Sequence, residues 1–458
     1  MAKKNVPYDQ EYYDKEIETM PREQLEELQL GYLKDELKFA YDNCPYYKRA
    51  WDEAGVSPEI ETLADLQKFP FINKQTERDT QGVGSFFGEL CGVPEDDVVY
   101  MATSSGSTGV PTMSPFTQGD FEDFMKAESR LFWQAGMRPN DRYLHGMNFA
   151  LYVGGPCVIG AQELGALGIW VGAVPSDRLL WAMKQYQPTF FWSSPSYAWQ
   201  LGQKAIEKGY DPKTDFASLK HIIISGEPGG SIESTRKAIE EIWDASVYDF
   251  FGLSDIYGAC AAMCDAKDGL HIIEDQILVE VVDPVTGEVL PDGERGEIVY
   301  TTLKKRARPM IRFRSGDIGH VNRETCECGR TMTRIYIQGR KDEMFIVSAV
   351  NVFPTDIEYV VRGLDATTRD CRASTSSASM TRTTRRVTRS PSSVRLAPMR
   401  RTMKSPSASK TSSRPIRAYV RQRFSCSIPT SSAPQASTRP SVLSTSVTRT
   451  RRKAGNQP

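Results

Sequence analysis

Between residues 98 and 260 the chain alternates short apolar runs with longer amphipathic runs, and this alternation constrains the fold more than any other feature. The apolar runs include VVYMAT, TFFWSS, HIIISG and SVYDFFG, and the amphipathic runs include FEDFMKAESRLFWQAG and LLWAMKQY. Strands that alternate with helices are typical of an α/β fold with a largely parallel sheet. We therefore predict an α/β fold for this part of the chain.

The flanking segments follow other patterns. Residues 1–75 are rich in Glu, Leu and Lys, with apolar residues three and four apart, which predicts helices and a helix end at Pro45. Residues 277–303 have the pattern of a strand, a Pro/Gly turn and a second strand, which predicts an antiparallel, barrel-like section. A strand, a turn at Pro354 and the start of a helix are expected after it. A length of 458 residues predicts two or three structural units.

The regular pattern ends after Gly363. Residues 364–458 consist mainly of Ser, Thr, Arg and Pro, contain no Glu, and carry 20 Lys and Arg against two acids. Residues 1–363 carry 37 basic and 56 acidic side chains, a net charge of −19. One interpretation is a disordered basic tail that binds nucleic acid, but the acidic body argues against it. We instead hypothesise a frameshift near residue 363, because Arg-, Ser- and Thr-rich text without Glu is typical of a GC-rich gene read in the wrong frame.

Cellular location is suggested by three features. The N-terminus has no apolar signal core, which argues against secretion. The most apolar stretch, 151–174, is interrupted by Gln162, Glu163 and glycines, so a buried strand and helix are favoured over a membrane span. Nine cysteines without a signal peptide favour a reducing cytoplasm, where thiols or metal ligands are expected rather than disulfides.

Two motifs suggest phosphate and base binding. In TSSGSTGVPT, at 103–112, hydroxyls and glycines leave N–H and O–H groups free to surround phosphate oxygens, although a Ser/Gly-rich surface loop is the alternative. No Gly-Lys-Ser/Thr closes it, so it is not a Walker loop. In YDFFGLSD, at 248–255, an aromatic ring can stack on a base and Asp255 can hold Mg²⁺, whereas a strand end with core Phe is the alternative.

Two charged turns follow. In RFRSGD, at 312–317, Asp317 can accept hydrogen bonds from two ribose hydroxyls, and a surface turn with an ion pair is the alternative. GRKDEM, at 339–344, is a charged turn between strands, and a solvated hairpin is the alternative. Each of these motifs is weak by itself.

In this order the four motifs resemble the AMP-forming adenylating superfamily, and the similarity is greatest to the phenylacetate–CoA ligase group. Further matching stretches are LADLQKFPFINK, SGEP at 225–228, KDGLHIIED, VDPVTGEVLPDGERGEIVYTTL and NVFPTDIEYVV. The resemblance covers residues 30–363. It implies an N-terminal adenylate-forming domain at 1–341 and, at 342–363, a hinge and the start of a C-terminal lid. Residues 364–458 then form an anomalous segment.

The resemblance also implies site residues. Asp255, as a Mg²⁺ ligand, and Asp342, as the hinge of the lid, are the catalytic candidates. Phe251 would stack on adenine, Asp317 would bind ribose, and Arg340 would support ribose or phosphate. The full set expected to bind ATP or AMP is Ser104, Ser105, Gly106, Ser107, Thr108, Gly109, Thr112, Ser225, Gly226, Glu227, Pro228, Asp249, Phe250, Phe251, Gly252, Asp317 and Arg340.

Three departures from the family pattern stand out. Val110 replaces a Lys common in the phosphate segment, and Ala349 replaces a Gly. The lid with its late Lys has no counterpart after residue 363, and Lys453 is not assigned that role because its surroundings do not match. We therefore expect this chain to keep ATP and acid binding but to lose most of the rate.

The implied activity is ATP-dependent activation of an aryl acid, phenylacetate by default, through an acyl-adenylate to its CoA thioester. His145, Phe149, Leu151 and Tyr197 would form an apolar slot for the ring, with core packing as the alternative. Two alternatives stay open. One is an adenylating relative that uses another acceptor, such as a deazaflavin cofactor or a carrier protein, and the other is an inactive truncated ligase. The expected partners are the aryl acid, ATP with Mg²⁺ and CoA; no membrane is expected, and a homodimer is left open.

Four residues suggest a metal site. Cys264, His271, Cys326 and Cys328 offer three sulfurs and an imidazole, a set suited to structural zinc. Cys260 is a rival ligand, and the Cys-x-Cys spacing is shorter than the usual zinc spacing. Free buried thiols are the alternative.

Overall fold

The structure, a computed structural model, describes residues 9–104, 110–146, 154–343, 345–347 and 350–352. All of them belong to one unit of the chain, Met1–Ser379. The predicted residues at 105–109, Phe149, Leu151 and the turn at Pro354 lie outside the described residues, as does the segment 364–458. The expected boundaries around residues 342 and 364 therefore stay predictions.

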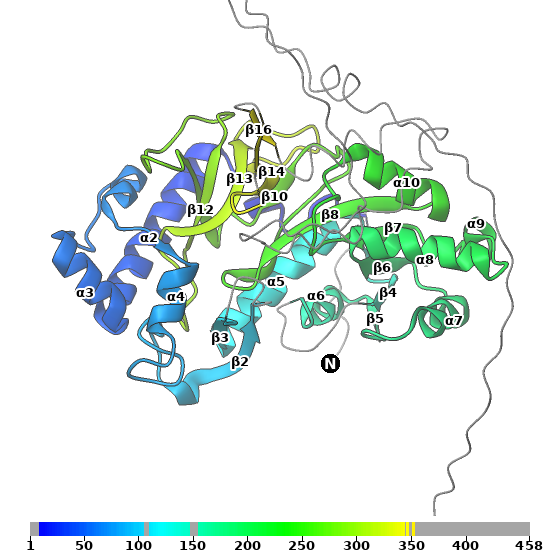
Figure 1. Ribbon diagram of the computed structural model, residues 1–458, viewed down its shortest axis with the longest axis horizontal. Helices are drawn as coiled ribbons and strands as arrows, with labels where there is room; N and C mark the ends of the chain where they lie inside the picture. Colours follow the sequence, from blue (N-terminus) through cyan, green and yellow to red (C-terminus); the bar gives the residue numbers. More distant parts are fainter. Residues whose placement is uncertain (1–8, 105–109, 147–153, 344, 348–349, 353–458) are drawn as a thin grey trace, which may run out of the picture. The chain divides into compact units, whose positions relative to one another are not determined.

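A mixed sheet of 12 strands is the central element (Figure 1). Its order is β11-β12-β13-β14-β10-β9-β8-β7-β6-β4-β5, and β1 pairs with β13. The strands are β1 (Ile72–Asn73), β4 (Arg142–His145), β5 (Leu167–Trp170), β6 (Phe190–Ser193), β7 (His221–Ile224), β8 (Ser246–Leu253), β9 (Tyr257–Ala262), β10 (Leu270–Ile272), β11 (Ile277–Val282), β12 (Gly296–Thr302), β13 (Phe313–Asn322) and β14 (Arg334–Arg340). Two antiparallel pairs stand apart from this sheet, β2 (Val98–Thr103) with β3 (Met113–Thr117) and β15 (Phe345–Val347) with β16 (Val350–Val352).

The helices connect or cover these strands. They are α1 (Lys15–Glu18), α2 (Arg22–Asn43), α3 (Pro45–Ala54), α4 (Lys74–Thr80), α5 (Gln118–Gln134), α6 (Cys157–Leu164), α7 (Ser176–Tyr186), α8 (Pro195–Glu207), α9 (Pro212–Asp215) and α10 (Glu233–Trp243). The helix end predicted at Pro45 is confirmed, because α2 ends at Asn43 and Pro45 begins α3, where its missing N–H has no intrahelical partner to lose.

Strand β8 joins a parallel half of the sheet to an antiparallel half. Its first part, Ser246–Asp249, pairs in parallel with β7, and its second part, Phe250–Leu253, pairs antiparallel with β9. Strands β4 to β7 are all parallel, as the alternating sequence pattern predicted. Strands β11 and β12 pair antiparallel, as predicted for 277–303, and they are part of the large sheet.

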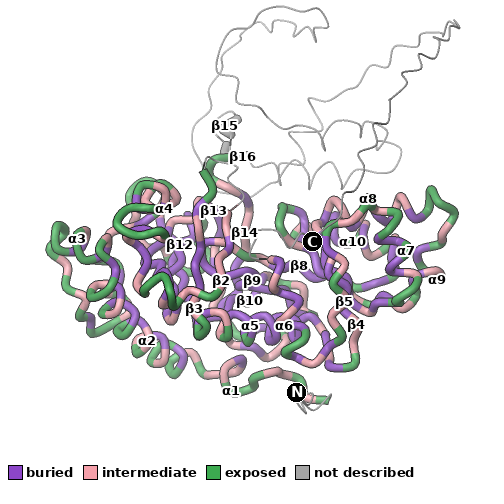
Figure 2. The backbone as a smooth tube through the Cα atoms, turned by 90° about the horizontal axis from the view of Figure 1, so that it is seen from below, coloured by how far each residue is buried: buried purple, intermediate pink, exposed green. Residues whose placement is uncertain are grey.

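The parallel half is apolar on both faces because helices cover both. Phe191 of β6 and Ile222 of β7 pack with α7, α8 and α10, whereas their neighbours Phe190 and Ile223 pack with α5 and α6. This period of two explains why these strands are continuous apolar runs in the sequence. In Figure 2 the buried positions accordingly follow the strands, and exposed positions mark the outer helices such as α3.

The N-terminal helices pack against strands from the far end of the body. Glu18 forms an ion pair with Arg330 at 2.6 Å, and Arg22 pairs with Glu274 at 2.9 Å. The Tyr47 hydroxyl donates a hydrogen bond to the carbonyl of Pro309 at 2.9 Å. Residues 15–54 are thus fixed by partners more than 200 positions away.

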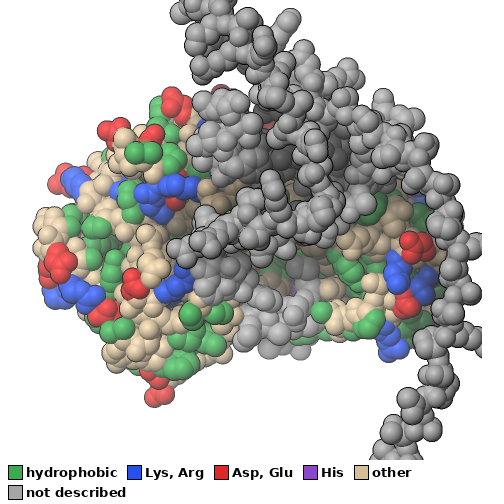
Figure 3. Space-filling view, in the orientation of Figure 1, with side chains coloured by type: hydrophobic (Ala, Val, Ile, Leu, Met, Phe, Trp, Pro, Cys, Tyr) green, Lys and Arg blue, Asp and Glu red, His purple; other side chains and the backbone are tan. Residues whose placement is uncertain are grey.

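Charged side chains are interspersed on the described surface drawn in Figure 3, where Lys and Arg lie beside Asp and Glu. The part of that face drawn in colour shows no single basic patch of the kind that binds nucleic acid. Within the described ranges, no helix has the length and apolar character that crossing a bilayer requires.

Candidate active site

Residues predicted to bind the nucleotide and the acid lie at or just after the carboxyl ends of strands β4, β7 and β8. His145 is the last residue of β4, Ser225 directly follows β7, and Asp255 follows β8. In open α/β sheets ligands bind in the crevice outside the carboxyl ends of the strands. The strand order therefore brings together motifs that are more than 100 residues apart.

The segment 103–112 connects β2 to β3, and its two ends are held together. The Ser104 N–H donates to the Thr112 carbonyl at 3.0 Å, and the Thr112 N–H donates to Ser104 Oγ at 3.0 Å. Thr112 is buried. The predicted phosphate residues Ser105 to Gly109 lie between these ends, outside the described part of the chain.

Asp255 lies against this segment. Its Oδ1 accepts hydrogen bonds from Thr112 Oγ1 at 3.0 Å and from Lys74 Nζ at 2.5 Å. Lys74 also donates to Thr112 Oγ1 at 2.7 Å. Burial alone would raise the pKa of Asp255, but the charges of Lys74 and Arg308 outweigh it and hold the pKa below its usual value. The predicted metal ligand is therefore an anion at neutral pH and touches the predicted phosphate segment.

Three charged residues of this cluster were missed by the sequence analysis. Lys74 and Glu77 lie in α4, and Arg308 lies in the loop between β12 and β13. Arg308 Nη2 is 2.9 Å from Glu77 Oε1 and 3.7 Å from Asp255 Oδ1. Burial raises the pKa of Glu77 to about 7, although Arg308 opposes that shift. With Glu77 partly protonated near neutral pH, Lys74 and Arg308 leave the cluster with excess positive charge.

The alternating faces of β8 separate its predicted site residues. Phe250 packs into the core, with ring centroids 5.3 Å from Trp192 and 5.8 Å from Phe132. Phe251, on the other face, is half-buried, and its ring lies parallel to that of Tyr300 at 6.3 Å. Of the two aromatic candidates, Phe251 is thus the one with an accessible face.

Two glycines are required by close packing around β8. A side chain at Gly252 would place its Cβ 1.5 Å from the carbonyl oxygen of Gly258, so the turn into β9 closes only on glycine. A Cβ at Gly230 would lie 2.1 Å from Asp249 Oδ1. Asp249 accepts a hydrogen bond from Ser231 Oγ at 2.6 Å, and burial raises its pKa to about 7. Asp249 therefore anchors the loop after β7 to β8.

The motif at 225–228 forms the first part of that loop. Ser225 Oγ accepts a hydrogen bond from Trp192 Nε1 at 2.7 Å, and Gly226 has a φ of 87°. Glu227 Oε1 accepts a hydrogen bond from the Ser196 N–H at 2.7 Å, at the start of α8. Gly226, Glu227 and Pro228 are exposed, which leaves this part of the loop open to a ligand.

The predicted ribose residues lie together where β13 pairs with β14. Asp317 is directly opposite Arg340, and Arg340 Nη1 lies 3.5 Å from Asp317 Oδ1. Burial raises the pKa of Asp317, while Arg340 opposes the shift. Asp317 Oδ2 is buried and accepts no hydrogen bond from the described residues. Arg340 Nε also donates to Asp342 Oδ1 at 3.0 Å, so the predicted hinge is tied to the ribose residues.

The predicted acid slot is only partly described. His145 is buried, its Nδ1 lies 2.5 Å from the Tyr143 hydroxyl, and burial lowers its pKa to about 4, so its imidazole is neutral. Its ring lies 6.0 Å from that of Trp192. Tyr197 is half-buried in α8 and its hydroxyl lies 3.0 Å from Ser176 Oγ at the start of α7. His145 and Tyr197 thus have different neighbours.

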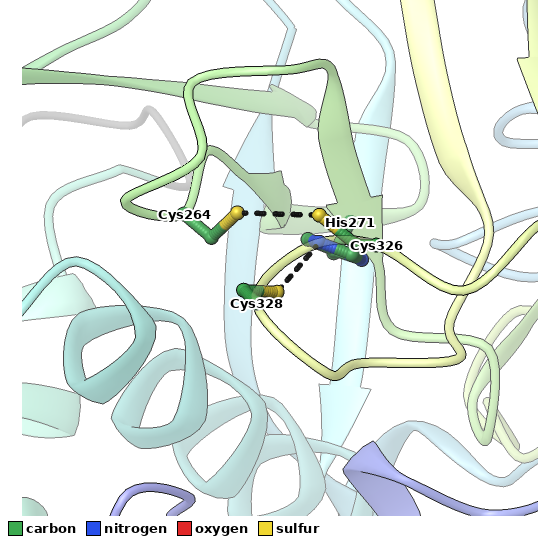
Figure 4. Close-up of side chains that lie close together, drawn as sticks. All are labelled: Cys264, His271, Cys326 and Cys328. Carbon is green, nitrogen blue, oxygen red and sulfur yellow. Dashed lines mark hydrogen bonds between the residues drawn. The ribbon is translucent and has the colours of Figure 1, made fainter.

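The four predicted metal ligands form one cluster (Figure 4). Their ligand atoms all lie within 4.8 Å of one another. Cys264 Sγ is 3.8 Å from Cys326 Sγ, and Cys328 Sγ is 3.4 Å from His271 Nε2. The rival Cys260 is not in the cluster. The described cysteines form no disulfide with one another: Cys44, Cys91, Cys157, Cys260, Cys264, Cys326 and Cys328.

Strand pairing assembles this cluster. His271 in β10 pairs with Ala262 of β9 and with Arg334 of β14, so Cys264, just after β9, and the turn before β14 come together. His271 Nδ1 lies 3.0 Å from the carbonyl of Met332, which leaves Nε2 to face the sulfurs. These features suit a tetrahedral site of three thiolates and one imidazole.

Comparison with known proteins agrees with this geometry. The model of the AMP-binding enzyme family matches residues 46–302. The phenylacetate–coenzyme A ligase of Thermus thermophilus is 36% identical over 354 residues, which cover 76% of this chain and 78% of that protein. The enzyme of the same name from Escherichia coli is 36% identical over 346 residues, 75% of this chain and 77% of that protein.

Solved structures give the same result. A crystal structure of 2-hydroxyisobutyryl-CoA ligase in complex with 2-HIB-AMP has a TM-score of 0.75 at 31% identity and covers 80% of this chain and 78% of that one. Another crystal structure of this ligase, with 2-HIB-AMP and CoA in the thioesterification state, has a TM-score of 0.71 at 32% identity and the same coverage. The fold, the ordered motifs and these similarities together show that the chain belongs to the AMP-binding enzyme family and, within it, to the AMP-forming acid–CoA ligases of the phenylacetate–CoA ligase group.

Proposed function

We propose that this chain binds ATP and an aryl acid, phenylacetate by default, joins them as an acyl-adenylate, and passes the acyl group to CoA. The observation that carries the proposal is the direct contact of Asp255 with Thr112 and Lys74, which brings an anion and a cation to the ends of the phosphate segment. A carboxylate lacks a leaving group, and transfer of AMP to it makes a mixed anhydride that a thiol can attack. The relatives named phenylacetate–coenzyme A ligases support the choice of acid.

Asp255 fits a magnesium ion. Its contacts with Thr112, Lys74 and Arg308 are all made by Oδ1, which leaves Oδ2 as the oxygen for a cation among the described residues. Carboxylate oxygens and substrate phosphates are the usual ligands of Mg²⁺. When bound, the ion would neutralise charge on the phosphates during transfer.

Lys74 would serve the phosphates. Its amine pairs with Asp255, and its side chain is 27% exposed, so it can reach a ligand. Val110, which stands where the family often has a Lys, is 67% exposed and carries no charge. The Lys74 ammonium also donates to Thr112 Oγ1 at 2.7 Å, so it lies at the end of the phosphate segment, where it would reach phosphate oxygens. We infer that Lys74 supplies the positive charge that Val110 does not.

The adenosine end would be held by three sites. Phe251 offers a half-buried ring for adenine, and the exposed loop 226–228 lies at the adjoining strand end. Asp317 Oδ2, buried without a hydrogen-bond donor from the described residues, suits a ribose hydroxyl. Arg340 would assist there, and Asp342 would act as the hinge.

The acid would lie near the end of β4. Neutral His145 packs edge-on with Trp192 and Tyr143, and this buried aromatic cluster at the end of β4 is consistent with an aryl group nearby. Phe149 and Leu151 are proposed as further members of this slot, whereas Tyr197 would border it from α8. The similarity to 2-hydroxyisobutyryl-CoA ligase makes a small hydroxy acid the competing substrate.

We further propose that Cys264, His271, Cys326 and Cys328 hold a structural zinc ion. The cluster links the β9–β10 connection to the turn before β14, and so stabilises the antiparallel half beside the site. Cys328 is half-buried and lines a cavity of about 340 Å³ together with Glu327 and Arg330, which gives a chelator access to the cluster.

The test is a panel of acids assayed for AMP release with and without CoA. Phenylacetate, indoleacetate and 2-hydroxyisobutyrate are the informative members. We expect acid-dependent exchange of pyrophosphate into ATP with phenylacetate, and AMP release stimulated by CoA at a rate well below that of a full-length relative. Adenylation without stimulation by CoA would favour another acceptor, such as a deazaflavin or a carrier protein. Absence of ATP binding by calorimetry would refute the proposal.

A further inference from the structure

Lys305 is a completely buried lysine in the loop between β12 and β13, next to the proposed metal ligand. Its Nζ donates hydrogen bonds to Ser114 Oγ at 2.9 Å and to the carbonyls of Asp255 at 3.2 Å and Ile256 at 2.6 Å. None of these three acceptors is a carboxylate. Burying a cation without a directly bonded anion is costly, and here that cost is offset by the three hydrogen bonds and by the ring of Phe116, whose centroid lies 4.2 Å from Nζ.

The hydrogen bonds from Lys305 to the carbonyls of Asp255 and Ile256 hold the main chain at Asp255. Arg308 Nη2 donates to the same Asp255 carbonyl at 3.3 Å. The side chain of Asp255 extends in another direction, to Thr112 and Lys74. Two cations therefore hold the backbone of Asp255, while its carboxylate meets the phosphate segment. Lys305 Nζ bonds both the Asp255 carbonyl and Ser114, and Ser114 lies two residues after Thr112. One nitrogen therefore connects the main chain on both sides of the contact between Asp255 and Thr112.

We propose that Lys305 is a positioning residue that acts through Asp255: it sets the main chain after β8 so that the Asp255 carboxylate meets the divalent cation of bound MgATP. This inference rests on the proposed function. Lys305 needs no contact with substrate for this role, because three short hydrogen bonds determine where the turn lies.

The test measures ATP binding rather than turnover. Calorimetry gives the Kd of ATP with excess Mg²⁺ and with EDTA, for the full chain and for K305M, which keeps the length of the side chain but removes its donors. We expect K305M to lose about tenfold of the affinity that Mg²⁺ adds, the effect of hydrogen bonds made by a charged group. Affinity in EDTA should not change. K305Q, which keeps a donor, should show a smaller loss and provides a second variant.

Lys304 is the matched control. It is the preceding residue, but its amine points to Asp123 at 3.8 Å and lies 5.0 Å from the ring of Tyr32. K304M should bind ATP as the parent does in both conditions. The double variant K305M with D255N should be no weaker than D255N alone, because the two residues act in one step.

The outcomes separate cleanly. Equal losses of ATP affinity in Mg²⁺ and in EDTA would overturn the inference, because Lys305 would then attract ATP directly by its charge. An unchanged Kd, or folding failure of both Lys305 variants, would overturn it in favour of a purely structural role. If the parent itself binds no ATP, the proposed function fails, which is distinct from a parent that binds MgATP and a K305M variant that binds it equally well.

Discussion

Replacing Lys74 with methionine tests the proposed phosphate site most directly. The amine of Lys74 lies 2.5 Å from Asp255 Oδ1 and 2.7 Å from Thr112 Oγ1, and its side chain is 27% exposed. If the ammonium moves to a phosphate when MgATP binds, its loss removes one hydrogen bond between charged groups. Such a bond contributes about 1.5–3 kcal/mol. The expected loss of ATP affinity is therefore about 10- to 150-fold.

The assay is calorimetric binding of ATP and of adenosine to the same proteins. K74M should weaken ATP but leave adenosine unchanged, because adenosine has no phosphate. K68M is the matched control: Lys68 forms a similar ion pair with Asp65 at 2.7 Å, but its side chain is 68% exposed and that ion pair lies within its own short helix rather than at the phosphate segment. It should bind both ligands as the parent does.

Rescue separates a phosphate contact from a structural role. Val110 is 67% exposed, so a lysine fits there without displacing buried atoms. The variant K74M/V110K should recover at least part of the lost ATP affinity, because the charge returns to the same segment. If ATP affinity is unchanged in K74M, or if adenosine weakens equally, Lys74 is a counter-ion of Asp255 and the reasoning is refuted.

Three further predictions follow from other parts of the body. Purified protein should contain one zinc per chain by elemental analysis; C328S should lose it while C260S keeps it, and equal zinc content in both would refute the assignment. Burial raises the pKa of Glu128 to about 8, so the folded state takes up a proton and the contribution of this residue to stability falls as pH rises from about 4.5 to about 8. E128Q should therefore raise the Tm more at pH 9 than at pH 5, and an equal shift would contradict this. G230A should lower the Tm, at a cost of about 1–3 kcal/mol, because its Cβ would lie 2.1 Å from a carboxylate oxygen. G31A, where nothing lies within 4 Å, should not lower it.

Local periodicity made much of the fold predictable. Apolar runs with both faces covered by helices have a strong signal, so the strands β6, β7 and β8 and helix α5 were found from sequence. The run VVYMAT was wrongly placed with them, because it forms β2 of a separate antiparallel pair. The change from parallel to antiparallel pairing within β8 was not predicted, because it depends on the direction of the neighbouring strand β9. Nothing in the residues 246–253 encodes it.

The candidate site was predictable where its residues form compact motifs. Asp255 and Thr112 belong to such motifs, and the structure brings them together. Lys74, by contrast, lies 181 positions before its partner, and its charged neighbours resemble an ordinary helix surface. Lys305 looks like one of several exposed basic residues in LKKRAR, and only the fold reveals that it is buried. The cysteine–histidine cluster was predicted in full, because thiols and imidazoles are rare enough to stand out.

The long-range closure of the body sets the order in which it can be completed during synthesis. The helices at 15–54 are made first, yet their partners at Glu274, Pro309 and Arg330 emerge from the ribosome last. While about 200 further residues are synthesised, the helices at 15–54 lack these partners and keep an apolar side exposed. Exposed apolar surface of this kind favours chaperone binding. The last strand of the described main sheet, β14, ends at Arg340, before the change of composition at residue 363. All strands of the described main sheet are therefore synthesised before the ribosome reaches the Ser-, Thr- and Arg-rich segment 364–458.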